Sequence, residues 1–222
     1  MANPVDYVNE HLEEFVGDLE EFLRIPSVST DPRRAGEVRR AASWLVNEFR
    51  RVGVSEVRMV DTPGHPIVLA RYGDDPDKPT VLCYGHYDVQ PPDPIDLWES
   101  PPFEPTRRNG SIYARGAADD KGQLMMHVKA FQSFLESGTE LPVNVRFIIE
   151  GEEEVGSAHL GSFIAEHREW LKSDVVLVSD TDEIEGLKRS MEALAQDFFA
   201  PNQMGPRPEQ EPNDILFFRV AG

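Results

Sequence analysis

The sequence predicts a layered α/β fold. Segments with helical spacing of apolar residues alternate with short apolar runs typical of buried strands, and turn-forming residues separate them. In addition, four islands of acidic and histidine residues each follow a predicted strand or precede a predicted helix. Ligand sites in open α/β sheets gather at the carboxyl ends of the strands, so we expect any functional site at that edge.

Two amphipathic helices are predicted at the start of the chain. In residues 4–24, apolar side chains recur at three- and four-residue steps until Pro26 ends the pattern. Residues 25–34 contain prolines, serines and a threonine, which predicts a loop. A second helix is predicted from about Gly36 to Val52, with Gly53 as its stop.

The following segments alternate between strands and helices. Strands are predicted at 56–60, 66–72, 80–84, 143–150 and 174–178, and helices at 121–137 and 158–170. The strand at 80–84 is apolar throughout, which indicates burial on both faces. The proline-rich segment 90–105 predicts a surface loop.

The last forty residues differ in character. A helix-like stretch at 184–199 is followed by a segment with four prolines between Pro201 and Pro212, and a short apolar run occupies 215–221. The proline-rich stretch resembles a linker more than a domain interior. We therefore divide the chain into residues 1–182, which form the α/β unit, and an atypical tail, 183–222, that is partly helical and then proline-rich.

Composition narrows the class of protein. The 222 residues carry 22 Lys+Arg and 40 Asp+Glu, a net charge of -18, which argues against nucleic-acid and polybasic membrane partners. The lone cysteine, Cys83, forms no intrachain disulfide. The first fifteen residues lack the pattern of a signal peptide, and no apolar run approaches the roughly 18–20 residues of a membrane span. We expect a soluble cytoplasmic protein.

The four polar islands are ordinary when they are taken singly. They read GHYDVQP (85–91), GAADDKGQ (116–123), EGEEEVGS (150–157) and VSDT (178–181). A histidine after a strand is commonly structural, paired aspartates before a helix are commonly a cap, and a run of glutamates is commonly a solvated face. A Ser-Asp pair after a strand is a common turn.

Together, the islands predict a metal site. One imidazole and several carboxylates would meet at one edge of a sheet, which is costly unless cations neutralise the carboxylates. Imidazole and carboxylate oxygen suit zinc, with manganese or cobalt as alternatives. Residues two apart at a strand end share a face, so Asp88 can accept the second imidazole proton and orient His86.

At these residues the sequence resembles the co-catalytic zinc exopeptidase and amidohydrolase family. That family includes cytosolic dipeptidases, carnosinases, aminoacylases, acetylornithine deacetylase, succinyl-diaminopimelate desuccinylase and glutamate carboxypeptidase. The resemblance covers about residues 1–182, with all four islands in the family's order. The residue patterns of the islands look closest to those of the dipeptidase branch. It implies the N-terminal part of an α/β/α catalytic domain that holds two zinc ions and hydrolyses a small peptide or related amide.

The resemblance also implies a role for each site residue. The metal ligands would be His86, Asp119, Glu154 and Asp180, with Asp119 bridging both metals and joined to Asp120 by a cis peptide. Asp88 would orient His86. Glu153 would be the general base, taking a proton from the metal-activated water and returning it to the leaving amine.

The chain departs from this family in one respect. Members are about twice as long, with an inserted lid domain that dimerises and a later segment that supplies a last histidine ligand. No histidine follows Asp180 here. We therefore expect a truncated catalytic domain without the lid, with impaired activity.

Other interpretations of the sequence are a non-catalytic protein, a hydrolase of another class and a nucleotide hydrolase. A non-catalytic protein could retain the fold as a metal-binding or interaction module. A hydrolase with a serine or cysteine nucleophile is disfavoured, because no G-x-S-x-G elbow is present and Cys83 lies within an apolar strand. No G-x-x-x-x-G-K phosphate loop is present, which disfavours nucleotide hydrolysis.

Overall fold

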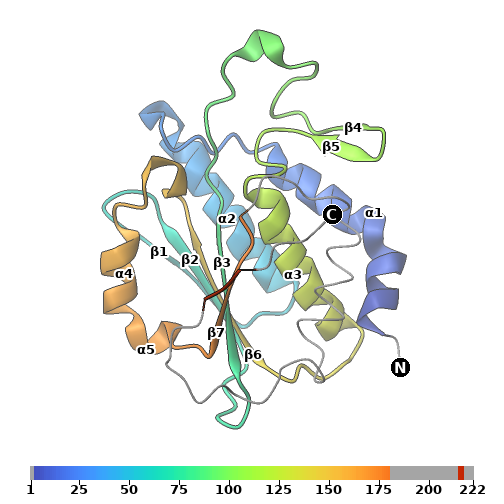
Figure 1. The fold of residues 1–222 in the computed structure, drawn as a ribbon, viewed down its shortest axis with the longest axis vertical. Coiled ribbons are helices and arrows are strands. Elements are labelled where there is room, and N and C mark those ends of the chain that lie inside the picture. Colours follow the sequence, from blue (N-terminus) through green and yellow to red (C-terminus); the bar gives the residue numbers. More distant parts are fainter. Residues whose placement is uncertain (1–2, 181–214, 218–222) are drawn as a thin grey trace.

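A computed structural model describes residues 3–180 and 215–217 of the chain. It has three layers: a mixed β-sheet with helices on both faces (Figure 1). Helices α2 and α3 lie on one side of the sheet, and α4 and α5 lie on the other. The predicted α/β/α architecture is confirmed for the described residues. The helix-like stretch predicted at 184–199 lies outside them, and the boundary at residue 182 stays a prediction.

The main sheet has the strand order β1-β2-β6-β3-β7-β8. Its strands are β1 (Glu56–Val60), β2 (Ile67–Tyr72), β6 (Asn144–Glu150), β3 (Thr80–His86), β7 (Val175–Val178) and β8 (Ile215–Phe217). β1, β2 and β6 pair antiparallel, whereas β6, β3, β7 and β8 run parallel. The predicted strand at 80–84 is confirmed as buried and extends two residues further, so His86 ends β3.

Three helices cover one face of the sheet and enclose the main core. α1 (Pro4–Leu23) begins with Asn3 as its cap, whose side chain accepts the N–H of Val5, and α2 (Ala35–Arg51) is followed by Gly53 at φ 98°. α3 (Lys121–Glu136) is buried over almost its whole length, because it lies between the sheet and α1. The bounds predicted for these helices differ from the observed ones by one residue at most.

The opposite face carries a smaller apolar cluster. Side chains of α4 (Leu160–Glu166) and α5 (Arg168–Leu171) pack there on the sheet through Phe163 and Leu171. The prediction of one continuous helix over 158–170 was wrong, because two short helices occupy this segment. Ser157 has φ 50°, which delays the start, and His167 leaves helical geometry (φ −106°, ψ 18°) while its Nδ1 lies 2.9 Å from the Phe163 carbonyl oxygen.

A small projection extends beyond the carboxyl ends of the parallel strands (Figure 1). It contains the predicted proline-rich loop, a 3-10 turn at Ile95–Leu97, and a hairpin of β4 (Thr106–Arg108) and β5 (Ser111–Tyr113) that the sequence did not predict. Asn109 and Gly110 adopt positive φ between the two strands, as a tight hairpin requires. In the part of the chain that the structure describes, no helix combines the length and apolarity needed to cross a membrane.

Candidate metal centre

The four islands meet at the carboxyl edge of the parallel strands. His86 and Glu150 are paired residues at the ends of β3 and β6, and Asp180 follows β7 by two residues. Asp119 lies in the loop before α3. The sheet brings these side chains together because β6, β3 and β7 run parallel and end at one edge.

His86 lies at the centre of this cluster. Its side chain is fully buried, and its Nε2 lies 3.1 Å from Asp119 Oδ1, 3.9 Å from Glu153 Oε2 and 4.0 Å from Asp180 Oδ2. Burial opposes the charged ring, but hydrogen bonding to Asp119 and Asp88 outweighs it and raises the pKa of His86 to about 11. The cluster thus presents a strongly cation-attracting environment.

Two groups of three side chains have the geometry to hold a metal ion. His86 with Asp119 and Asp180 forms one, and His86 with Glu153 and Glu154 forms the other; within each group the ligand atoms lie within 4.8 Å of one another. Imidazole and carboxylate oxygens suit zinc and related divalent cations. The residues present therefore fit a metal, and every metal ligand predicted from the sequence lies in one of these groups.

The peptide bond between Asp119 and Asp120 is cis, as the resemblance implied. Asp120 is buried, and its Oδ2 accepts the main-chain N–H of His86 at 3.0 Å, whereas its Oδ1 has no partner. Burial raises the pKa of Asp120 well above its usual range. A Cβ at Gly85 would lie 2.8 Å from Asp120 Oδ2, so this close approach needs a glycine. Neither aspartate side chain caps α3, which leaves Asp119 available to the cluster.

Asp88 lies beside His86 as predicted, and it makes further contacts that were not predicted. His86 Nδ1 lies 3.1 Å from the main-chain carbonyl oxygen of Asp88 and 3.4 Å from its carboxylate Oδ1. The buried carboxylate also accepts the main-chain N–H groups of Glu153, at 3.3 Å, and of Glu154, at 3.1 Å. Asp88 therefore contacts both His86 and the turn that carries Glu153 and Glu154.

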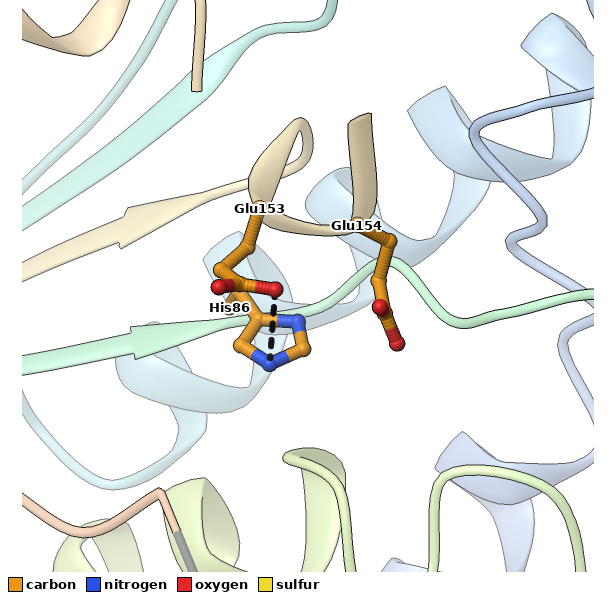
Figure 2. Close-up of side chains that lie close together, drawn as sticks. All are labelled: His86, Glu153 and Glu154. Carbon is orange, nitrogen blue, oxygen red and sulfur yellow. Dashed lines mark ion pairs between the residues drawn. The ribbon is translucent and has the colours of Figure 1, made fainter. Parts of the chain in front are cut away.

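Glu153 and Glu154 begin a 3-10 turn, η3 (Glu153–Val155), that follows β6 (Figure 2). The Glu153 carboxylate lies close to the His86 ring. The Glu154 side chain, from the next residue of the turn, extends beside the ring. Burial raises the pKa of both carboxyl groups, and the hydrogen bond from Gln90 partly offsets this for Glu154. The two neighbours thus occupy different surroundings, as two different roles require.

The strand ends are braced from outside the cluster. Tyr87 is buried, donates its hydroxyl to the Pro66 carbonyl at 2.5 Å, and donates its main-chain N–H to the Glu150 carbonyl at 2.9 Å. A Cβ at Gly151 would lie 2.4 Å from the Tyr87 ring, so the glycine after β6 permits this packing. Ser27, in the loop after α1, donates its hydroxyl to the Tyr87 carbonyl at 2.6 Å.

Sequence reasoning missed two sets of contacts at this site. Gln90 donates its side-chain amide to Glu154 Oε2 at 2.6 Å, although nothing in the GHYDVQP pattern signals that contact. Glu152 Oε1 accepts the N–H of His65 at 3.2 Å, and its Oε2 lies 2.7 Å from His159 Nδ1. A run of glutamates predicts a solvated face, but here each of the three has its own partners.

The other five histidines all lie within the described residues, and none joins either metal-binding group. His127 is buried in α3, and neither of its ring nitrogens has a hydrogen-bond partner. The metal-binding groups therefore share a single imidazole, that of His86.

Comparisons with known proteins agree with this geometry. Residues 82–197 match the model of peptidase family M20/M25/M40. The chain is 39% identical over 188 residues to the Cys-Gly metallodipeptidase dug1 of Schizosaccharomyces pombe, covering 79% of this chain and 40% of that protein. It is 36% identical over 189 residues to the human Beta-Ala-His dipeptidase, covering 78% and 37% respectively.

A solved structure shows the same arrangement of elements. The structure of human carnosine dipeptidase 1 superposes with a TM-score of 0.77 at 36% identity, over 82% of this chain and 41% of that chain. The present chain thus spans about two fifths of the length of these relatives.

Proposed function

Because the chain belongs to peptidase family M20/M25/M40, we propose that it is a metal-dependent hydrolase that cleaves dipeptides or related amides. The observation that carries the proposal is the convergence of His86, Asp119 and Asp180 beside the carboxylate of Glu153. The names of its relatives, a Cys-Gly metallodipeptidase and a Beta-Ala-His dipeptidase, support small peptides as the substrate class.

In this proposal His86, Asp119 and Asp180 would hold one metal, and Glu154 would hold a second, with Asp119 serving both. Glu153, which lies in the group with Glu154, would be left to act on a proton. Zinc is the proposed metal, with manganese or cobalt able to replace it. A divalent cation at such a site lowers the pKa of a bound water and polarises the scissile carbonyl. The single buried cysteine, Cys83, suits a reducing compartment, so we place the protein in the cytoplasm.

Glu153 is the proposed general base. It takes a proton from the attacking water as the new C–O bond forms, and it returns that proton to the leaving nitrogen as the C–N bond breaks. Its raised pKa supports this role, because a base works best when its pKa lies nearer the working pH. Its neighbour Glu154 would hold the metal, so the two glutamates would have different roles.

A metal-binding module without turnover is the second candidate. The observation in its favour is that the Glu154 side of the cluster gains no imidazole besides His86 from the described residues. Both candidates predict metal binding, so metal content alone does not separate them. They differ in whether a bound metal leads to hydrolysis.

The test is turnover of dipeptides by the chelator-treated chain after zinc, cobalt or manganese is added back. The hydrolase predicts metal-dependent release of amino acids that Glu153→Ala abolishes. Metal binding without any release in the wild-type chain would support the module instead. Release that persists in Glu153→Ala would identify a contaminating peptidase and remove the support for this assignment.

A further inference from the structure

We propose that the buried carboxylate of Asp88 is a positioning group that caps the turn carrying Glu153 and Glu154. In this role the carboxylate fixes the two glutamates, while the main chain of the same residue fixes the imidazole of His86. The inference rests on the proposed function for its importance to catalysis.

The contacts are specific to the two main-chain N–H groups. Asp88 Oδ1 accepts the N–H of Glu153 at 3.3 Å, and Oδ2 accepts the N–H of Glu154 at 3.1 Å. Each oxygen of the carboxylate thus serves one residue of the turn. Asp88 is fully buried, so water cannot take over these bonds when the side chain is removed.

The turn has no cap of its own. The first N–H groups of a helical turn lack partners within it, and the residue before it usually supplies a side-chain acceptor. Glu152 holds that position, at φ −133°, but makes no capping hydrogen bond. Its carboxylate is directed instead to the N–H of His65 and the ring of His159. Asp88, which is 65 residues from Glu153 in sequence, supplies the missing acceptor.

The ring of His86 contacts both the main chain and the side chain of Asp88. Its Nδ1 lies 3.1 Å from the main-chain carbonyl oxygen, closer than the 3.4 Å to Oδ1. A side-chain substitution leaves that carbonyl in place. We therefore infer that loss of the carboxylate releases the glutamate turn before it releases the imidazole, so that the 3.9 Å spacing between His86 Nε2 and Glu153 Oε2 is what changes.

The test compares Asp88→Asn and Asp88→Ala with the wild type, using the full metal-free chain and nuclear magnetic resonance. Two quantities are measured: the solvent-exchange rates of the Glu153 and Glu154 amide protons, and the hydrogen-bonded Nδ1–H resonance of His86. Losing a hydrogen bond to a charged acceptor should speed exchange about tenfold or more. Asp88→Ala should affect both amides. Asp88→Asn keeps the volume but turns a donor toward one N–H, so at least one amide should respond.

Asp119→Asn is the matched control. Asp119 also contacts the His86 ring, at Nε2 rather than Nδ1, and its side chain is exposed. It should leave both amide rates unchanged. Faster amide exchange in the Asp88 variants, with the Nδ1–H resonance retained, supports the proposal.

Unchanged amide rates in folded Asp88→Asn, or loss of the ring resonance with the amides unaffected, would overturn it. If Asp88→Ala does not fold, Asp88→Asn decides the question. Because the measurement needs neither metal nor substrate, its failure leaves the proposed hydrolysis standing. Equally, a lack of turnover in the wild-type chain would not change the result of the amide-exchange comparison.

Discussion

Gln90 holds the carboxylate of Glu154 at both oxygens. Its side-chain amide donates to Oε2 at 2.6 Å, and its main-chain N–H donates to Oε1 at 3.1 Å. A carboxylate oxygen has more than one lone pair, so it can accept these bonds and still bind a metal. Partners of this kind fix the direction in which a ligand faces its metal.

Gln90→Glu should weaken the binding of the metal ion for which Glu154 is the proposed ligand. The substitution keeps the length of the side chain but replaces a donor with a second carboxylate against the first. We expect a roughly 10–100-fold loss of zinc affinity, the usual effect of removing a partner of a metal ligand. Calorimetric titration of the chelated chain measures it. In a Glu154→Ala background the same change should have no further effect, and an equal loss there would show that Gln90 acts elsewhere.

Glu153 and Glu154 should respond differently to truncation. Glu153→Ala should abolish measurable dipeptide hydrolysis and leave bound metal nearly unchanged, because its proposed role concerns a proton. Glu154→Ala should lower the metal content. Metal analysis and turnover on the same preparations make the comparison. The reverse pattern would mean that the two roles are exchanged between the neighbours.

A buried ion cluster joins the three helices on the main face. Lys129 of α3 is fully buried and pairs with Asp18 of α1 and Glu48 of α2. Glu48→Leu leaves the lysine with one carboxylate, and breaking such a buried pair costs about 3–5 kcal/mol. Urea unfolding should show that loss.

The double variant Lys129→Met/Glu48→Leu supplies the control for this cluster. It removes both buried charges and should recover much of the stability, because apolar side chains of similar volume often replace a buried ion pair without loss. A double variant no more stable than Glu48→Leu would contradict this explanation.

His127 should make the fold sensitive to mild acid. Burial without a hydrogen-bond partner lowers the pKa of His127 from its ordinary 6.5 to about 4. Between these values the unfolded chain takes up a proton that the folded chain does not, so stability is present above about pH 6.5 and is lost as the pH falls toward 4. At pH 5 this single group should cost about 2 kcal/mol.

The comparison for His127 is the variant His127→Met. Its stability should fall less than that of the wild type between pH 7 and pH 5, as measured by urea unfolding at both values. Titrating carboxyl groups contribute equally to the two proteins, so the difference isolates the histidine. Identical losses in both proteins would show that His127 is protonated without cost in the fold.

Much of the site could be predicted because it depends on local pattern and strand direction. His86 and Glu150 come from apolar runs that could be recognised as buried strands, and parallel strands bring their ends to one edge. The order of the islands then predicted which side chains would meet. Helix bounds were also predicted closely where a proline or glycine marks the end, as at Gly53.

What could not be predicted depends on long-range geometry. The choice of His86 Nδ1 between the carbonyl and the carboxylate of Asp88 is a matter of tenths of an ångström. The hairpin at β4 and β5 is short and half-exposed, so it has no apolar pattern to reveal it. Lys129 meets Glu48 across 81 residues, and no sequence pattern links them.

The most direct test of the metal centre is a zinc titration of His86→Ala beside the wild type, by calorimetry after chelation. His86 is the one imidazole that both metal-binding groups share, so its loss should weaken zinc binding at least about tenfold. His11→Ala, on α1 and outside both groups, is the control and should bind as the wild type does. Equal zinc stoichiometry and affinity in the wild type and His86→Ala would contradict the account.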